Sequence, residues 1–242
     1  MKGSERNGFI VMTVAILVVA ALAAGIASAD PLSPQTLTES PGQTRDTNLP
    51  SQSLNAQAGN VTAVNIHGLS VTDVWQGYFG NITGTITLDD ASNNTFYNWS
   101  TASPTGEIFA SRAASPTWAT VECANVTHVT AEEAALTIGD LKSDGINETF
   151  TKTTHDAFSI GETDFIADDC SYTTNAYGSS GSQDAVWDEV LLYDTTSATT
   201  VFATIIGQDS TAFNGGTSDF EMLIPTDTTL TTTQYYFFVQ LS

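Results

Sequence analysis

The acidic stretch 140–147, which reads DLKSDGIN, has the clearest spacing of oxygen-bearing side chains in the chain. Carboxylates at Asp140 and Asp144, with a glycine after the second and the amide of Asn147 beyond it, match the first half of a calcium loop. Lys142 stands where a third oxygen ligand is needed, and no glutamate stands at the twelfth position. The stretch therefore predicts an acidic turn that binds calcium weakly at best.

The chain holds two cysteines, Cys123 and Cys170, and in an exported protein two cysteines pair by default. A cysteine nucleophile would instead need a histidine beside it in the fold. His128 and His155 are available, but no catalytic signature surrounds either cysteine. We therefore expect one intramolecular disulfide between Cys123 and Cys170 and no reactive thiol.

Other catalytic and metal-binding patterns are weak. The histidines His67, His128 and His155 are far apart and lack the H-x-x-x-H spacing of a transition-metal site. His155 adjoins Asp156, yet the chain has no G-x-S-x-G nucleophile elbow. Paired carboxylates for glycoside hydrolysis stay an alternative, because their separation depends on the fold and not on sequence spacing. We expect a protein without catalytic activity and without a cofactor.

Aromatic side chains could line a sugar-binding groove, so a carbohydrate-binding or carbohydrate-active domain stays an alternative function. The candidates are Trp75, Tyr78, Phe79, Trp99, Trp118 and Trp187. In a β-domain of this size, however, we expect most large aromatic side chains to be needed for the core.

Several asparagines stand in N-x-S/T sequons, the acceptor sites for glycans in exported proteins. They are Asn60, Asn81, Asn93, Asn98, Asn125 and Asn147. A chain rich in Thr and Asn also produces sequons by chance. The confinement of these sites to residues 60–147 predicts one sugar-coated face or end, with the C-terminal third packed or paired elsewhere.

The composition predicts an acidic, well-solvated surface and excludes a binder of nucleic acid. Lys and Arg number 6 against 27 Asp and Glu, so the formal net charge is −21. A nucleic-acid interface needs a basic patch, and an anionic lipid surface would repel this charge. Such a charge favours solubility, high salt or cation binding.

Residues 1–29 have the form of a secretory signal peptide, with a basic start, an apolar run and an A-x-A site that ends at Ala29. The run is also near the length of a membrane span, so an uncleaved anchor is an alternative. The segment further resembles a type IV pilin leader cut between Gly8 and Phe9, although Thr13 replaces the usual glutamate. We expect cleavage after Ala29 and an extracellular or cell-surface location.

Residues 30–58 hold Pro31, Pro34, Pro41 and Pro50 among Gln, Thr, Ser and Asn, with few apolar residues. Such a segment cannot bury enough surface to offset its ordering entropy, so it predicts a disordered, flexible linker. Alternatively, the stretch 53–56 could donate a strand to the sheet edge of a neighbouring subunit.

Residues 59–242 alternate short apolar segments with turn-rich joins. The stretch 74–99 opens with aromatics, alternates apolar residues with hydroxyls over 82–88, and returns over 95–99. The alternation predicts a strand with one buried face and one wet face. Further strands are predicted at 61–66, 106–112, 117–123, 158–160, 165–166, 186–193, 200–206, 220–224 and 234–241.

One short helix is predicted inside this domain. Thr130, with Glu133 three residues later, has the form of a capping box, and we expect one or two helical turns that end at Gly139. The remaining elements show no alternation of strands with helices. The predicted fold is therefore an all-β antiparallel β-sandwich with one short helix.

The stretch WQGYFGNITGTITLDDASNNTFYNW, with WDEVLLYD and the final TTTQYYFFVQLS, resembles a group of uncharacterised secreted surface proteins encoded by archaea. The resemblance covers most of residues 60–242 and implies a cell-surface location and an archaeal host. It implies nothing about activity or site residues.

Together these features predict a secreted or cell-surface structural or adhesion β-domain protein without catalytic activity. One alternative is a subunit of an extracellular filament, pilin-like or strand-donating, and another is a carbohydrate-binding or carbohydrate-active domain. We expect attached glycans and self-assembly or a cell-envelope partner. A membrane anchor through the N-terminal helix is expected if that helix is not cleaved.

Overall fold

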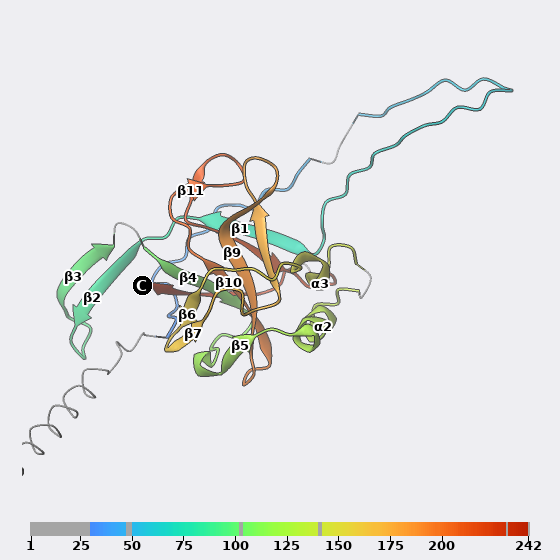
Figure 1. The fold of residues 1–242 in the computed structure, drawn as a ribbon. Coiled ribbons are helices and arrows are strands. Elements are labelled where there is room, and N and C mark those ends of the chain that lie inside the picture. Colours follow the sequence, from blue (N-terminus) through green and yellow to red (C-terminus); the bar gives the residue numbers. More distant parts are fainter. Residues whose placement is uncertain (1–29, 47–49, 102–103, 140–141, 231, 242) are drawn as a thin grey trace, which may run out of the picture.

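A computed structural model describes residues 30–46, 50–101, 104–139, 142–230 and 232–241 of the chain (Figure 1). Strands account for 36% of it and helices for 8%, so the predicted mostly β fold with antiparallel sheets is confirmed. The predicted signal peptide, residues 1–29, lies outside the described residues. Within the described ranges, no helix is both long and apolar enough to cross a membrane.

The centre of the fold is a six-stranded antiparallel sheet, formed where β-branched and aromatic residues cluster. Its strands, in spatial order, are β14 (Tyr236–Leu241), β4 (Gly106–Ser111), β10 (Thr199–Ile205), β9 (Gln183–Asp194) and β5 (Val121–Cys123), with β8 (Thr173–Tyr177) also paired to β9. The predicted strands at 106–112, 186–193, 200–206 and 234–241 are thus confirmed, with shifted ends.

Both faces of the central sheet are buried, because successive side chains of a strand point to opposite sides. In β4, Ile108 and Ala110 join one hydrophobic core, and Phe109 between them joins the other. In β10, Phe202 joins the first core and Val201 the second. Alternation along these strands therefore separates two cores.

A two-stranded sheet covers the first core. Its strands, β1 (Trp75–Gly80) and β13 (Phe220–Pro225), are antiparallel, and Met222 and Ile224 of β13 are buried in that core. The backbone N–H of Leu223 donates a hydrogen bond of 2.9 Å to the carboxylate of Glu189 on β9. This bond fixes the outer edge of β13 to the central sheet.

A short hairpin covers part of the second core. It consists of β6 (Phe158–Ile160) and β7 (Thr163–Phe165), and the rings of Phe158 and Phe165 stack with centroids 4.7 Å apart. A further two-stranded sheet, β11 (Ser210–Thr211) with β12 (Thr217–Ser218), closes the loop before β13.

The main helix, α2 (Val126–Ala135), begins earlier than predicted. Its N-cap is Asn125, whose side-chain oxygen accepts hydrogen bonds from the N–H groups of Thr127 (2.9 Å) and His128 (3.2 Å). The predicted N-cap, Thr130, lies inside the helix, and its hydroxyl donates to a carbonyl one turn earlier. That prediction was wrong because an asparagine upstream supplies the acceptor that the first turn needs.

The predicted end of this helix at Gly139 was also wrong. The helix ends at Ala135, and the chain turns away through Thr137, which adopts a left-handed φ of 55°. Glu133, predicted to complete the capping box, instead accepts a hydrogen bond of 3.0 Å from the N–H of Asn147. This contact joins α2 to the single-turn helix α3 (Ile146–Thr149).

Two predicted strands need correction. Residues 61–66 form no strand, and within the described ranges they pair with no other segment. Val, Thr and Ile favour extended backbone, but a strand also needs a neighbour for its backbone hydrogen bonds. The predicted strand at 117–123 begins as a 3₁₀ turn, Trp118–Thr120, and only its last three residues, β5, form a strand, which pairs with β9.

The predicted linker, residues 30–58, holds no helix and no strand where it is described. One isolated bridge joins it to the edge of the central sheet. The N–H of Leu32 donates to the carbonyl of Val239 at 3.0 Å, and the return bond measures 2.8 Å. Pro31 and Pro34 flank Leu32 and lack the N–H groups that would extend the pairing.

Candidate interaction surface

The hairpin of β2 (Gly84–Asp89) and β3 (Thr95–Thr101) projects from the body of the molecule (Figure 1). Among the described strands, β2 and β3 pair only with each other. Their alternation is the one predicted from sequence, but its apolar face is not buried. Ile86 lies opposite Trp99 in the register, and the two side chains are 52% and 49% exposed.

The second cross-strand pair on this face is Leu88 with Tyr97, which are 51% and 56% exposed. We call the surface formed by Ile86, Leu88, Tyr97 and Trp99 the apolar hairpin face. The prediction that alternation over 82–88 buries one side was therefore wrong. Alternation fixes which side chains share a face, but it does not say whether another element covers that face.

Apart from Phe96, which lies beside the bulge in β3 and is 84% exposed, the opposite face and the turn of the hairpin are polar. Thr87 lies opposite Asn98, and its hydroxyl donates a bond of 2.8 Å to the carboxylate of Asp89. At the turn, Asp90 accepts bonds from Asn94 and Ser92, and the side-chain bond from Asn94 lowers the pKa of Asp90 most. The hairpin thus has a largely polar face, a turn that is held by hydrogen bonds to Asp90, and one uncovered apolar face.

Three predicted glycan sites lie on or beside this hairpin, away from its apolar face. Asn81 precedes β2, and Asn93 stands in the turn with a left-handed φ of 62°. Asn98 lies on the polar face beside Thr87 in the register. Sugars at these positions would leave the apolar hairpin face open.

The remaining sequons are scattered. Asn60 is exposed in the segment before β1, and Asn147 lies in α3. Asn125 is the N-cap of α2, so its side-chain oxygen is already engaged by two backbone N–H groups. The six sites therefore do not form a single face, and their use stays a prediction.

The predicted calcium ligands are only partly described. Asp140 lies outside the described residues. The carboxylate of Asp144 accepts a bond of 2.7 Å from the Thr72 hydroxyl, and its carbonyl accepts one of 2.6 Å from the Trp75 indole N–H. In the part of the chain that is described, no three His, Cys, Asp or Glu side chains are grouped for a metal ion. Asp144 instead fastens the start of β1 to the loop before α3.

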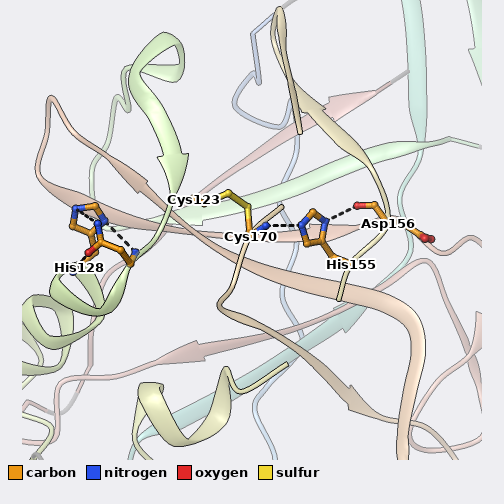
Figure 2. Close-up of a disulfide and its surroundings, with 6 residues drawn as sticks. Cys123, His128, His155, Asp156 and Cys170 are labelled. Atoms are coloured by element: carbon orange, nitrogen blue, oxygen red, sulfur yellow. Dashed lines mark hydrogen bonds between the residues drawn. A yellow bond between two sulfur atoms is a disulfide. The ribbon is translucent and has the colours of Figure 1, made fainter. Parts of the chain in front are cut away.

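The disulfide between Cys123 and Cys170 is confirmed, with Cα atoms 5.2 Å apart (Figure 2). It ties the end of β5 to the loop after β7. The N–H of Cys170 donates a bond of 3.0 Å to Nε2 of His155, and Nδ1 of His155 bonds the carbonyl of Asp156 at 2.7 Å. Both ring nitrogens therefore serve backbone groups, and His155 and Asp156 form no side-chain dyad.

His128 lies apart from the disulfide, on α2 (Figure 2). Its ring stacks on Tyr193 of β9, with centroids 3.7 Å apart. The backbone N–H of Asn125 donates to its Nδ1 at 3.4 Å, which completes the capping box. His128 therefore stabilises the start of a helix and does not serve either cysteine.

Most aromatic candidates for a sugar groove belong to the cores. Trp118 and Trp187 are buried, and Trp75 and Tyr78 pack against the first core. On the hairpin, Trp99 lies beside Tyr97 with centroids 4.7 Å apart, and the two ring planes are tilted by 58°. Rings at that angle do not form the flat platform on which a sugar ring would stack.

Two buried carboxylates were not anticipated from the sequence. Glu107 on β4 is 6% exposed, and one oxygen accepts a bond of 3.3 Å from the N–H of Ser159. Glu189 on β9 is 1% exposed and accepts the bond from Leu223. In the part of the chain that the structure describes, the second oxygen of each has no hydrogen-bond partner. Burial raises the pKa of Glu107 to about 7 and the pKa of Glu189 well above its ordinary value.

These carboxylates lie on opposite sides of the central sheet. Glu107 shares its face with Phe109 of the second core, two residues along β4. Glu189 shares its face with Leu191 of the first core, two residues along β9. They therefore do not form the carboxylate pair that glycoside hydrolysis requires.

A shallow depression of about 430 Å³ lies on the outer side of α2. The described residues that line it are Val126, Thr127, Thr130, Ala131 and Ala134. Its only polar side chains are the hydroxyls of Thr127 and Thr130, and the Thr130 hydroxyl donates to the carbonyl of Val126.

Comparison of the chain with family models, curated proteins and solved structures finds no match. The resemblance of the stretch around β1, β2 and β3 to secreted archaeal proteins therefore stays a prediction.

Proposed function

We propose that this protein is an extracellular structural protein whose copies associate through the apolar hairpin face. The observation that carries this proposal is that face: Ile86, Leu88, Tyr97 and Trp99 are each about half exposed on a projecting two-stranded sheet. An isolated two-stranded hairpin is only marginally stable in water, and uncovered apolar surface marks a site of association. The hairpin thus gains its stability from a partner.

A second copy is the partner that fits the charge of the molecule. Each copy carries a formal charge of −21, so two copies repel each other wherever charged surfaces meet. Within β2 and β3 the only charged residue is Asp89, at the end of the strand that enters the turn. The hairpin is therefore a surface on which two acidic copies can meet without bringing negative charges face to face.

The location outside the cell is supported by two features. The disulfide between Cys123 and Cys170 is the kind of bond that persists in oxidising compartments. Residues 1–29 have the form of a signal peptide, with an anchor or pilin leader as alternatives. We propose export with cleavage after Ala29, glycans on several sequons and an archaeal cell surface as the setting.

A β-sandwich is the finer fold description that the packing supports, because the β1–β13 sheet lies over one face of the central sheet. A role without catalysis is supported by what the candidate groups do. The two cysteines are bonded to each other, and the ring of His155 is held between two backbone groups.

Protease treatment of intact cells and sedimentation of the purified protein test this proposal. Protease treatment of intact producing cells should remove the domain, and the purified intact protein should sediment as a concentration-dependent assembly. The double variant Ile86→Thr/Trp99→Thr should sediment as a monomer, because it removes one cross-strand pair from the apolar hairpin face. Thr87→Ser, on the polar face of the same strand, is the matched control and should associate like wild type. A wild-type protein that stays monomeric at all concentrations would reject the proposal.

A further inference from the structure

The segment before β1 is an extended arm with uncovered apolar side chains. Residues 50–71 contain no helix and no strand, and the chain runs out from the body and back again (Figure 1). Val61 and Ile66 are 102% and 88% exposed, and Val64 is 51% exposed. Residues 61–66 have the composition of a strand but lack a partner, which is why they were predicted as one.

The β2–β3 hairpin lacks the complementary part. Among the described strands, none pairs with either outer edge of the hairpin. Such edges are templates for another strand. Three strands with a hydrophobic face can be stable where two are not.

The arm and the hairpin leave from opposite ends of β1. The arm leads into Trp75, and the hairpin follows Gly80 (Figure 1). The root of the arm is fastened by the hydroxyl of Thr72 to Asp144, and Asp73 forms an ion pair with Lys142.

This fastening keeps the arm from its own hairpin. From Ile66 to the fixed Thr72 the chain reaches at most about 20 Å, which is about the length of β1 itself. The chain between Ile66 and Thr72 would have to span the length of β1 and, in addition, the distance from the end of β1 to an outer edge of the hairpin. The hairpin of a second copy has no such limit.

The arm and the β2–β3 hairpin also match in their lack of charge and in their side-chain pattern. Between residues 53 and 71 the arm holds no Lys, Arg, Asp or Glu. In an added strand Val64 and Ile66 point to one side, as Ile86 and Leu88 do in β2. An uncharged arm meeting an almost uncharged hairpin avoids the repulsion between two copies at −21.

We propose that residues 61–66 of one copy add as a third strand to the β2–β3 hairpin of a second copy. Val64 and Ile66 then extend the apolar hairpin face across three strands. The contact joins two different surfaces at opposite ends of β1, so each copy can accept one neighbour and donate to another, which builds an open chain or a ring. This inference rests on the proposed association of copies and names the segment that each copy contributes.

Complementation of two variants tests the inference. The arm variant is Val64→Ser/Ile66→Ser, and the hairpin variant is Ile86→Thr/Trp99→Thr. When purified as the intact protein and tested by itself, each variant should sediment as a monomer. Mixed together they should form a one-to-one dimer and nothing larger, because one copy supplies the only intact hairpin and the other the only intact arm. Leu54→Ser, outside residues 61–66 of the same arm, is the control and should assemble like wild type.

The outcomes separate the two proposals. If the arm variant still assembles while the hairpin variant does not, hairpins meet each other directly, and the strand donation is wrong while the association stands. If wild type is monomeric and its arm protects its own hairpin from hydrogen exchange, the arm folds back and both proposals fail. The midpoint of urea unfolding should match wild type for every variant, since the substituted side chains lie outside the two cores.

Discussion

Glu107 sets a pH dependence of stability at the scale of a single residue. Burial raises its pKa from 4.5 to about 7, so the folded protein holds a proton that the unfolded chain releases between these values. Stability therefore falls as pH rises from about 4.5 to 7 and then levels. Glu107→Gln keeps an acceptor for Ser159 without the charge. At pH 8 it should raise the free energy of unfolding by up to about 3 kcal/mol.

Urea denaturation at pH 5 and pH 8 measures this difference. Glu122→Gln, on the exposed side of β5, is the control and should leave the pH dependence as it is in wild type. An equal effect of Glu107→Gln at both pH values would show that the carboxylate of Glu107 ionises freely in the folded protein.

The disulfide is the second prediction at this scale. The bridge closes a loop with a sequence separation of 47, and in the chain-entropy model such a closure stabilises the fold by about 4 kcal/mol. Cys123→Ser/Cys170→Ser should lower the free energy of unfolding by roughly that amount, measured by thermal or urea unfolding. A loss under about 1 kcal/mol would mean that the loop is already ordered in the unfolded chain.

At the scale of elements, the N-cap of α2 separates a structural role from a glycan role. Asn125→Ala removes both the cap and the sequon and should cost about 1 kcal/mol of stability. Thr127→Val removes the sequon but keeps the Thr127 backbone N–H that the cap binds. Unfolding of non-glycosylated protein should therefore show a loss for Asn125→Ala alone. Equal losses for both variants would contradict the capping role.

Strands of the central sheet could be predicted because their composition is decisive. The runs of β-branched and aromatic residues in β10 and β14 favour strands, and both form there, where neighbouring strands supply the pairing. The fate of residues 61–66 could not be predicted in this way, since composition does not supply a pairing partner. The start of α2 could have been predicted from Asn125, but the capping-box pattern at Thr130 and Glu133 favoured a later start.

The candidate surface was predictable only in part. The alternation in β2 correctly placed Ile86 and Leu88 on one face. That the face is uncovered depends on how β1 directs the chain away from the body, which no local pattern shows. The burial of Glu107 likewise follows from the β6–β7 hairpin packed over it, and a single acid in a strand does not signal that.

At the scale of the whole molecule, charge should govern association. Copies at −21 repel each other, and salt shortens the range of this repulsion from about 10 Å at 0.1 M to about 3 Å at 1 M. Association between uncharged surfaces should therefore strengthen when NaCl rises over that range, as measured by sedimentation. The hairpin variant should stay monomeric at both concentrations. An assembly that dissociates in high salt would instead depend on ion pairs.

The position of β1 has a mechanical consequence. If copies are joined arm to hairpin, tension along the chain of copies enters at Trp75 and leaves at Gly80, along the length of the strand. Both points lie on β1, so its extended backbone carries the tension directly, and the six residue pairs between β1 and β13 do not have to bear it. The root of the arm is also bonded to Lys142 and Asp144, which lie within the loop closed by Cys123 and Cys170, so part of the pull on the arm passes into that loop.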